Sequence, residues 1–297
     1  MAPLCAPGGS SAHRPDRRHR PTATDPSDRS PGAQELRRQA EVTLDIAIGD
    51  RPRLKRLVER IDNCVKLKTY WQCCNVNAID RLNLNDHGPT HIKIVAKLAT
   101  TILRLLGQAG VRPSVCVNYH LSEEDAEIIV LLATCLHDLG HIVDRDHHEE
   151  YSIALAPALL AELLTGLYAE REQAIITAET LHAIVAHDTY IQPFTVEAGT
   201  LKVADALDME QGRARIPFSK GSPSIHAVSA MAIERVQVRP GKEKPVCIEI
   251  QMSNSAGIFQ LDNLLKPKLQ NSGIKEYFEI RAEITGPEKK ILDTYQI

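Results

Sequence analysis

Histidines and acidic residues crowd together behind an apolar run near the middle of the chain, where residues 132–152 read LATCLHDLGHIVDRDHHEEYS. A solvated surface would not need so many imidazoles. An apolar core would not accept so many carboxylates, because burying such groups unpaired is costly. Transition-metal ions bind both imidazole nitrogen and carboxylate oxygen. The stretch therefore indicates a metal site.

Further polar residues interrupt segments that are otherwise apolar and helical in pattern. His91, His187 and Asp205 share this property with the adjacent pair His137 and Asp138. Buried imidazoles and carboxylates must be paired or metal-bound, so we expect these five residues to converge. Three imidazoles with two carboxylates suit Mn²⁺, Fe²⁺, Co²⁺, Ni²⁺ or Zn²⁺ better than Ca²⁺.

The segments that carry these residues have the spacing of helices. Apolar residues predict helix from 34 to 71, including residues 36–48, with a break at 49–52. After Gly88-Pro89, Thr90 is expected to cap a helix that begins at His91. Along that helix, apolar residues recur every three or four positions, which predicts one buried face.

The pair His137-Asp138 is expected at the end of a central helix. Ser122 and Asp125 form a capping-box pattern at its start, and the residues that follow are apolar on all sides. Such a helix must be buried. Further helices are predicted over about 147–167, from about 171 through IVAHD, and over LKVADALDME.

The C-terminal part changes its period from 3.6 to 2. Residues 246–252 and 278–284 alternate between apolar and polar, and 233–238 do so loosely. A helical stretch over 257–269 is strained by Pro267. The sequence therefore predicts a mostly α-helical protein with three parts: a disordered tail over 1–34, a helical domain over 35–224, and a small α+β domain over 225–297.

Charge and composition exclude several classes of protein. The net charge of −3 gives no overall attraction to nucleic acid, and no apolar run is long enough to span a membrane. Seven cysteines, an odd number without a Cys-x-x-Cys pair, favour a reduced, cytoplasmic location. A homo-oligomer is left open.

The order of these segments resembles the HD-domain metal-dependent phosphohydrolases. HIKIVAKLA, CLHDLGH, HHEEYSIALAPALL, IVAHD and VADALD follow one another over roughly residues 85–210. The resemblance implies an HD-type helical bundle with a metal core of His91, His137, Asp138 and Asp205. Dinuclear members add two histidines, which His148 and His187 resemble, so two divalent transition-metal ions are expected.

The resemblance also implies a reaction. Asp138 would bridge two metal ions, and a hydroxide activated by them would attack phosphorus in a nucleotide or related small phosphorylated metabolite. Many members have lysine where this chain has His141, so His141 could be a substrate contact, a proton donor or a structural residue. Arg213 and Arg215, just beyond Asp205, are candidate phosphate-binding residues.

Several alternatives stay open at this stage. His147 competes with His148 as a ligand, and Asp208 is the second choice after Asp205. His87 could approach the site or cap a loop, and His182 is expected to be structural or exposed. Two other functions share the ligand set: an HD-type diiron oxygenase and a nucleotide-binding sensor without turnover.

Overall fold

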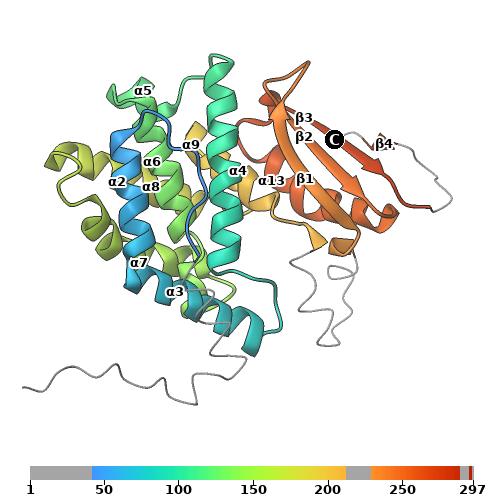
Figure 1. Ribbon diagram of the computed structural model, residues 1–297, viewed down its shortest axis with the longest axis horizontal. Coiled ribbons are helices and arrows are strands. Elements are labelled where there is room, and N and C mark those ends of the chain that lie inside the picture. The colour runs from blue at the N-terminus through green and yellow to red at the C-terminus, as the bar shows by residue number, and fades with distance from the viewer. Residues whose placement is uncertain (1–41, 212–228, 288–293, 296–297) are drawn as a thin grey trace, which may run out of the picture.

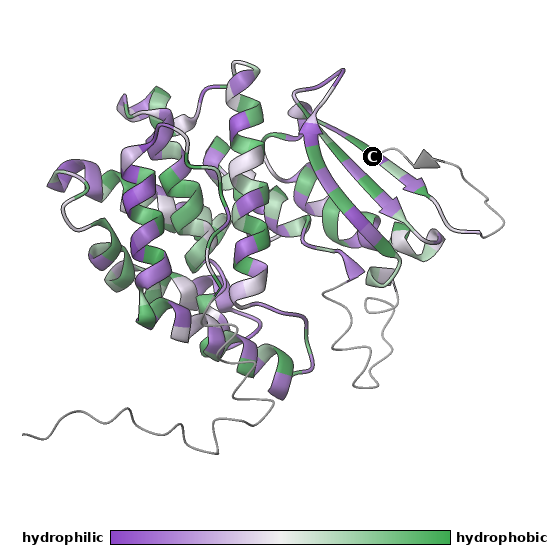
Figure 2. Ribbon diagram, in the orientation of Figure 1, coloured by the Kyte–Doolittle hydropathy of each residue, from purple (hydrophilic) through white to green (hydrophobic). Residues whose placement is uncertain are grey.

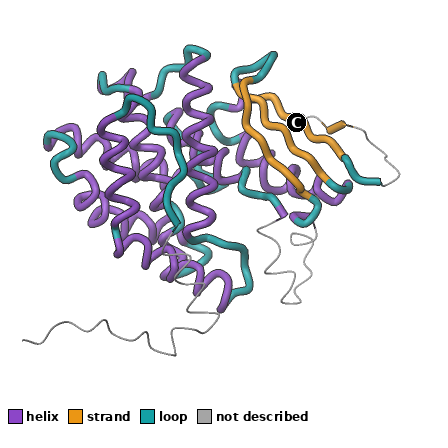
Figure 3. The backbone as a smooth tube through the Cα atoms, in the orientation of Figure 1, coloured by secondary structure: helices purple, strands orange, loops and turns teal. Residues whose placement is uncertain are grey.

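The protein consists of a helical bundle beside a small β-sheet (Figure 1). The computed structural model describes residues 42–211, 229–287 and 294–295. The predicted tail over 1–34 lies outside these residues. The prediction of a mostly helical fold with a small C-terminal α+β part is confirmed (Figure 3).

The bundle is built around α6 (Glu123–Leu136). Every residue of α6 from Asp125 to Leu136 is buried, because α4, α8, α9 and α2 all pack against it. Figure 2 shows hydrophobic segments along these helices, whose apolar residues form most of the buried core. The helices are α2 (Pro52–Asn63), α3 (Val65–Asn75), α4 (Pro89–Gln108), α5 (Ser114–Tyr119), α6, α7 (His148–Leu164), α8 (Glu170–Ala186) and α9 (Val196–Ala206), with a π-turn, η2 (Val76–Arg81), and a 3-10 turn, η3 (Leu139–Ile142). No helix in the described ranges is long and apolar enough to cross a membrane.

The start of α6 is fixed by the predicted capping box. The Ser122 hydroxyl accepts the backbone N–H of Asp125, and the Asp125 carboxylate accepts that of Ser122. The same carboxylate pairs with Arg53 of α2 and accepts the hydroxyl hydrogen bond of Tyr168. One local cap therefore also ties α2 and the α7–α8 connection to the central helix.

Two local predictions are wrong. Residues 42–50 form no helix: they run as an extended segment in which Leu44 is buried and donates its N–H to Asp62. The apolar residues at 42, 44, 46 and 48 alternate, and this period of two outweighs a helical pattern here. Helix α4 begins at Pro89 rather than after Thr90, because proline needs no N–H partner in a first helical turn.

The C-terminal sheet has the order β1-β2-β3-β4. Its strands are β1 (Ile233–Pro240), β2 (Val246–Met252), β3 (Phe278–Ile284) and β4 (Thr294–Tyr295). The β1–β2 and β3–β4 pairs are antiparallel and β2–β3 is parallel. The alternating apolar residues of β2 and β3 are buried, as their pattern predicts.

The connection from β2 to β3 is helical and joins the sheet to the bundle. It comprises η4 (Ser255–Gly257), α12 (Ile258–Gln260), the π-turn η5 (Leu261–Leu265), α13 (Lys266–Gln270) and η6 (Lys275–Tyr277). Pro267 falls in the first turn of α13, directly after the π-turn, so its missing N–H is accommodated by a change of helix type. Helix α13 packs against α9, while α4 contacts β1 and β2 (Figure 1).

Substituting one glycine should reveal how tightly η3 approaches α7. A Cβ on Gly140 would lie 1.9 Å from the His148 carbonyl oxygen, whereas a Cβ on Gly107, in the last turn of α4, would meet nothing within 4 Å. We expect Gly140→Ala to lower the free energy of unfolding by about 2 kcal/mol or more. The matched change Gly107→Ala should be neutral or stabilising by up to ~1 kcal/mol. Urea unfolding measures both; equal stability of the two variants would contradict the close approach.

Candidate metal centre

Six of the residues predicted to carry chemistry lie together at the ends of five helices. His91 lies in the first turn of α4, and His137 and Asp138 follow α6 directly. His148 begins α7, His187 follows α8, and Asp205 lies in the last turn of α9. All are buried except Asp205, whose side chain is 15% exposed.

Ser152 joins the end of α6 to the start of α7. Its hydroxyl donates to the His137 carbonyl at 2.6 Å and accepts the Gly140 N–H at 2.8 Å. This clamp turns the chain after Asp138 and places His148, one helical turn before Ser152, on the same side. The buried Trp71 indole N–H bonds the Cys135 carbonyl at 2.8 Å and fixes the same helix end from α3.

The first group of possible ligands is the pair His91 and His137 with two carboxylates. The two Nε2 atoms lie 3.3 Å apart. Asp138 Oδ2 is 3.3 Å from His91 Nε2 and 3.4 Å from His137 Nε2. Asp205 Oδ1 is 3.3 and 3.7 Å from the same two nitrogens. Four donor atoms thus converge on one point.

The second group is the pair His148 and His187. Their Nε2 atoms lie 3.2 Å apart, and Asp138 Oδ1 is 3.5 Å from His148 Nε2. The two oxygens of Asp138 therefore face different histidine pairs. A carboxylate in this position can bridge two ions, and both groups have buried donors spaced closely enough to hold one.

In every imidazole of the two pairs, the nitrogen that faces away from the centre, Nδ1, is hydrogen-bonded. The Nδ1 atoms face acceptors: His91 faces Asp208 Oδ2 at 2.6 Å, His137 the Thr134 carbonyl at 2.8 Å, His148 the Arg145 carbonyl at 3.0 Å and His187 the Ile184 carbonyl at 2.5 Å. Carbonyl and carboxylate oxygens can only accept, so each Nδ1 carries the proton. The tautomer leaves each Nε2 as a lone pair directed into the centre.

Lone pairs that face each other at this distance need a cation between them. A proton is a poor choice for the second pair, because burial and the neighbouring His137 and Lys268 hold the pKa of His187 well below its ordinary value. Burial alone would raise the pKa of Asp138, but His137, His87 and His91 outweigh it and keep the carboxylate ionised. A divalent ion at each nitrogen pair would accept the lone pairs of the imidazoles and offset the charges of the carboxylates, so the donor set fits a metal.

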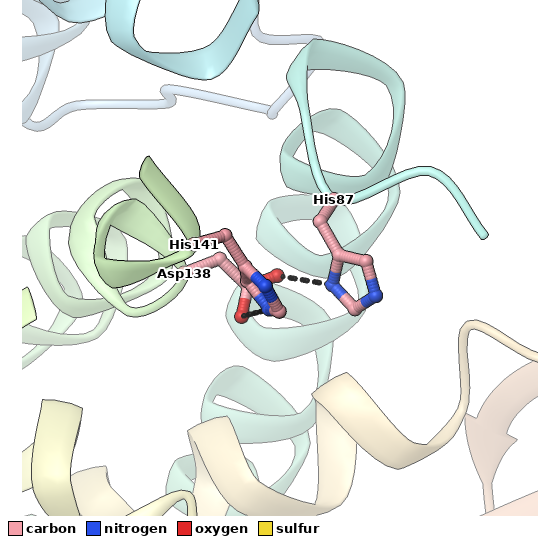
Figure 4. Close-up of side chains that lie close together, drawn as sticks. All are labelled: His87, Asp138 and His141. Atoms are coloured by element: carbon pink, nitrogen blue, oxygen red, sulfur yellow. Dashed lines mark hydrogen bonds and ion pairs between the residues drawn. The ribbon is translucent and has the colours of Figure 1, made fainter. Parts of the chain in front are cut away.

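His87 and His141 both contact Asp138 (Figure 4). His87 Nδ1 lies 2.8 Å from Asp138 Oδ2, and His141 Nε2 lies 3.6 Å from Oδ1. The His141 ring is stacked on His148 with centroids 4.3 Å apart. His141 Nε2 is buried and has no hydrogen-bond partner among the described residues, so it is available to a ligand.

The structure separates the competing candidates. His147 is exposed and lies 3.8 Å from Glu150, away from the centre. Asp208 faces the outer nitrogen of His91 and orients that imidazole instead of facing the pair. His182 stacks on Phe194 and accepts its N–H. Arg213 and Arg215 lie outside the described residues.

His87, which the sequence left open between approaching the site and capping a loop, lies at the site, with its Nδ1 2.8 Å from Asp138 Oδ2. One contributor, Lys268, escaped the sequence reasoning. Lys268 lies in α13, in the helical connection between β2 and β3, which together with the C-terminal sheet is called the sheet unit below. Its ammonium lies 2.6 Å from Asp205 Oδ2. Nothing near Lys268 in the sequence indicates that contact, because it depends on how the sheet unit packs on the bundle.

Comparison with known proteins agrees with this geometry. The family model described as "HD domain" matches residues 90–210, which contain both histidine pairs, Asp138 and Asp205. The chain is 41% identical over 243 residues to "Uncharacterized protein MJ1020" of Methanocaldococcus jannaschii, covering 82% of this chain and 93% of that protein. No solved structure matches the chain. The chain therefore belongs to the HD-domain superfamily of metal-dependent phosphohydrolases.

Proposed function

We propose that the protein hydrolyses a phosphate ester of a nucleotide or a related small phosphorylated metabolite, using two divalent transition-metal ions. One observation carries the proposal. The unprotonated Nε2 atoms of His91 and His137 lie 3.3 Å apart, those of His148 and His187 lie 3.2 Å apart, and the Asp138 carboxylate faces both pairs. Bound ions of this kind polarise phosphoryl oxygens and lower the pKa of coordinated water.

Each ion would have its own ligands. His91, His137, Asp205 and Asp138 Oδ2 would hold the first ion. The second would be held by His148, His187 and Asp138 Oδ1, which leaves more of its coordination positions for substrate and water. Asp138 would contribute one oxygen to each ion and so fix the position of one ion relative to the other.

The charge of this ligand set favours an anionic substrate. Asp138 and Asp205 supply two negative charges. The pKa values of both carboxyl groups are held well below the ordinary range by nearby groups, namely His137, His87 and His91 at Asp138, and Lys268, His137 and His91 at Asp205. Two divalent ions would leave the centre with a net positive charge, which suits a phosphoryl group. Arg213 and Arg215 remain proposed phosphate contacts.

His141 would act on the substrate as a neutral group. Burial lowers the pKa of His141 to about 2, despite the nearby Asp138. At neutral pH this imidazole offers an N–H or a lone pair, and its buried Nε2 has no hydrogen-bond partner among the described residues. A hydrogen bond to a phosphoryl oxygen or to water is therefore its proposed role, rather than proton donation as an imidazolium.

The function is tested by metal analysis and a panel of phosphate esters. Wild-type protein loaded with Mn²⁺ should hold about two ions per chain and hydrolyse a member of the panel. Asp138→Asn should lose most metal and all hydrolysis, and His148→Gln should keep one ion with most activity lost. His147→Gln alters an exposed neighbour and is the control, with both properties kept. Full hydrolysis by Asp138→Asn would refute the proposal.

The pH dependence of stability tests the state of His141. An unfolded histidine gains its proton below about pH 6.5, but buried His141 does not, so acidification favours unfolding. In metal-free protein we expect His141 to cost about 1 kcal/mol of stability between pH 7.5 and 5.5. His141→Gln should reduce this loss, and the exposed control His120→Gln should not. Denaturant titrations at both pH values measure it; an unchanged loss in His141→Gln would contradict a neutral, buried imidazole.

A further inference from the structure

The sheet unit contributes a charged side chain to the metal centre. Lys268 of α13 lies outside the matched HD-domain residues, and its ammonium forms an ion pair with Asp205 at 2.6 Å. The contact is to Oδ2, while Oδ1 faces His91 and His137. One carboxylate thus has its inner oxygen in the centre and its outer oxygen on a lysine from another part of the chain.

Lys268 is held in this position by the way α13 docks on α9. Residues 199, 202 and 205 lie on one face of α9, and each meets the C-terminal end of α13 or the residues after it. A Cβ on Gly199 would lie 2.4 Å from the Ser272 carbonyl oxygen, so only glycine permits this approach. The fully buried Lys202 donates to the carbonyls of Asn271 and Ile191.

The same docking reaches the second histidine pair. Asn271 donates its side-chain N–H to the Thr189 carbonyl at 2.9 Å, just beyond His187. Burial, His137 and the Lys268 ammonium together hold the pKa of His187 below its ordinary value. Lys268 thus pairs with one proposed ligand, Asp205, and the residue after its helix is tied to the turn that follows another, His187.

Among the described residues, the Lys268 ammonium does not use all of its hydrogen-bond donors. Lysine has three N–H donors, and Asp205 Oδ2 is the one acceptor within reach of Lys268 in the described part of the chain. The side chain is 11% exposed, and Asp205, at 15%, is one of the more open residues of the centre. When a divalent ion shares the charge of Asp205, the lysine's positive charge becomes available to an anion.

We propose that Lys268 is a substrate-binding residue that donates to a phosphoryl oxygen, so that the C-terminal sheet unit completes the active site of the HD domain. The inference rests on the proposed two-ion phosphohydrolase. A lysine serves as a point charge for phosphate, and it would strengthen the binding of dianionic substrates and of the phosphate product.

Calorimetric titration of the Mn²⁺-loaded full-length protein with inorganic phosphate tests this role. Lys268→Met should weaken phosphate binding by about tenfold or more without reducing the metal content. Lys268→Arg keeps a cation and should restore much of the affinity. The control is Lys266→Met, on the same helix, whose ammonium pairs with Asp262 at 3.2 Å and is 38% exposed. This variant should bind phosphate like the wild type.

Two results would overturn the role of Lys268. Unchanged phosphate affinity in Lys268→Met would show that the ammonium does not contact the anion. Loss of metal from Lys268→Met, restored in Lys268→Arg, would make it a support for Asp205 instead. Failure of the parent proposal is distinct: wild-type protein would then bind phosphate through Lys268 and yet hydrolyse no ester.

Discussion

The centre depends on four imidazoles whose outer nitrogens are already committed. Three donate to backbone carbonyls three residues earlier in the chain, and His91 donates to Asp208. These bonds fix both the tautomer and the ring orientation before any ligand arrives. The inner nitrogens then face each other in pairs, and only a cation relieves the repulsion between them. The capacity of the centre to hold a metal ion therefore follows from how the helix ends are built.

The surrounding helices hold this arrangement in place through burial and hydrogen bonds. Buried α6 provides a rigid platform for His137 and Asp138, and Ser152 ties its end to α7. Gly140 permits the close approach that brings His148 in. The docking of α13 on α9 makes the sheet unit part of the same framework, since Lys268 reaches a proposed ligand from outside the HD-domain match.

The sequence predicts those features that depend on local pattern. The all-apolar run predicts a buried α6, Ser122 and Asp125 predict its cap, and alternation predicts β2 and β3. It fails where two periods compete, as in residues 42–50, and it places the start of α4 at His91 instead of at Pro89. The roles of His87, Asp208 and Lys268 depend on contacts between distant segments, which local pattern does not encode.

The most direct test of this account is a crystal structure of Mn²⁺-loaded protein with anomalous scattering recorded near the manganese edge. Two peaks are expected, one among His91, His137 and Asp205 and the other between His148 and His187, with the Asp138 carboxylate touching both. A single peak, or two peaks that do not share Asp138, would contradict the central claim that one carboxylate joins two histidine pairs into a dinuclear centre.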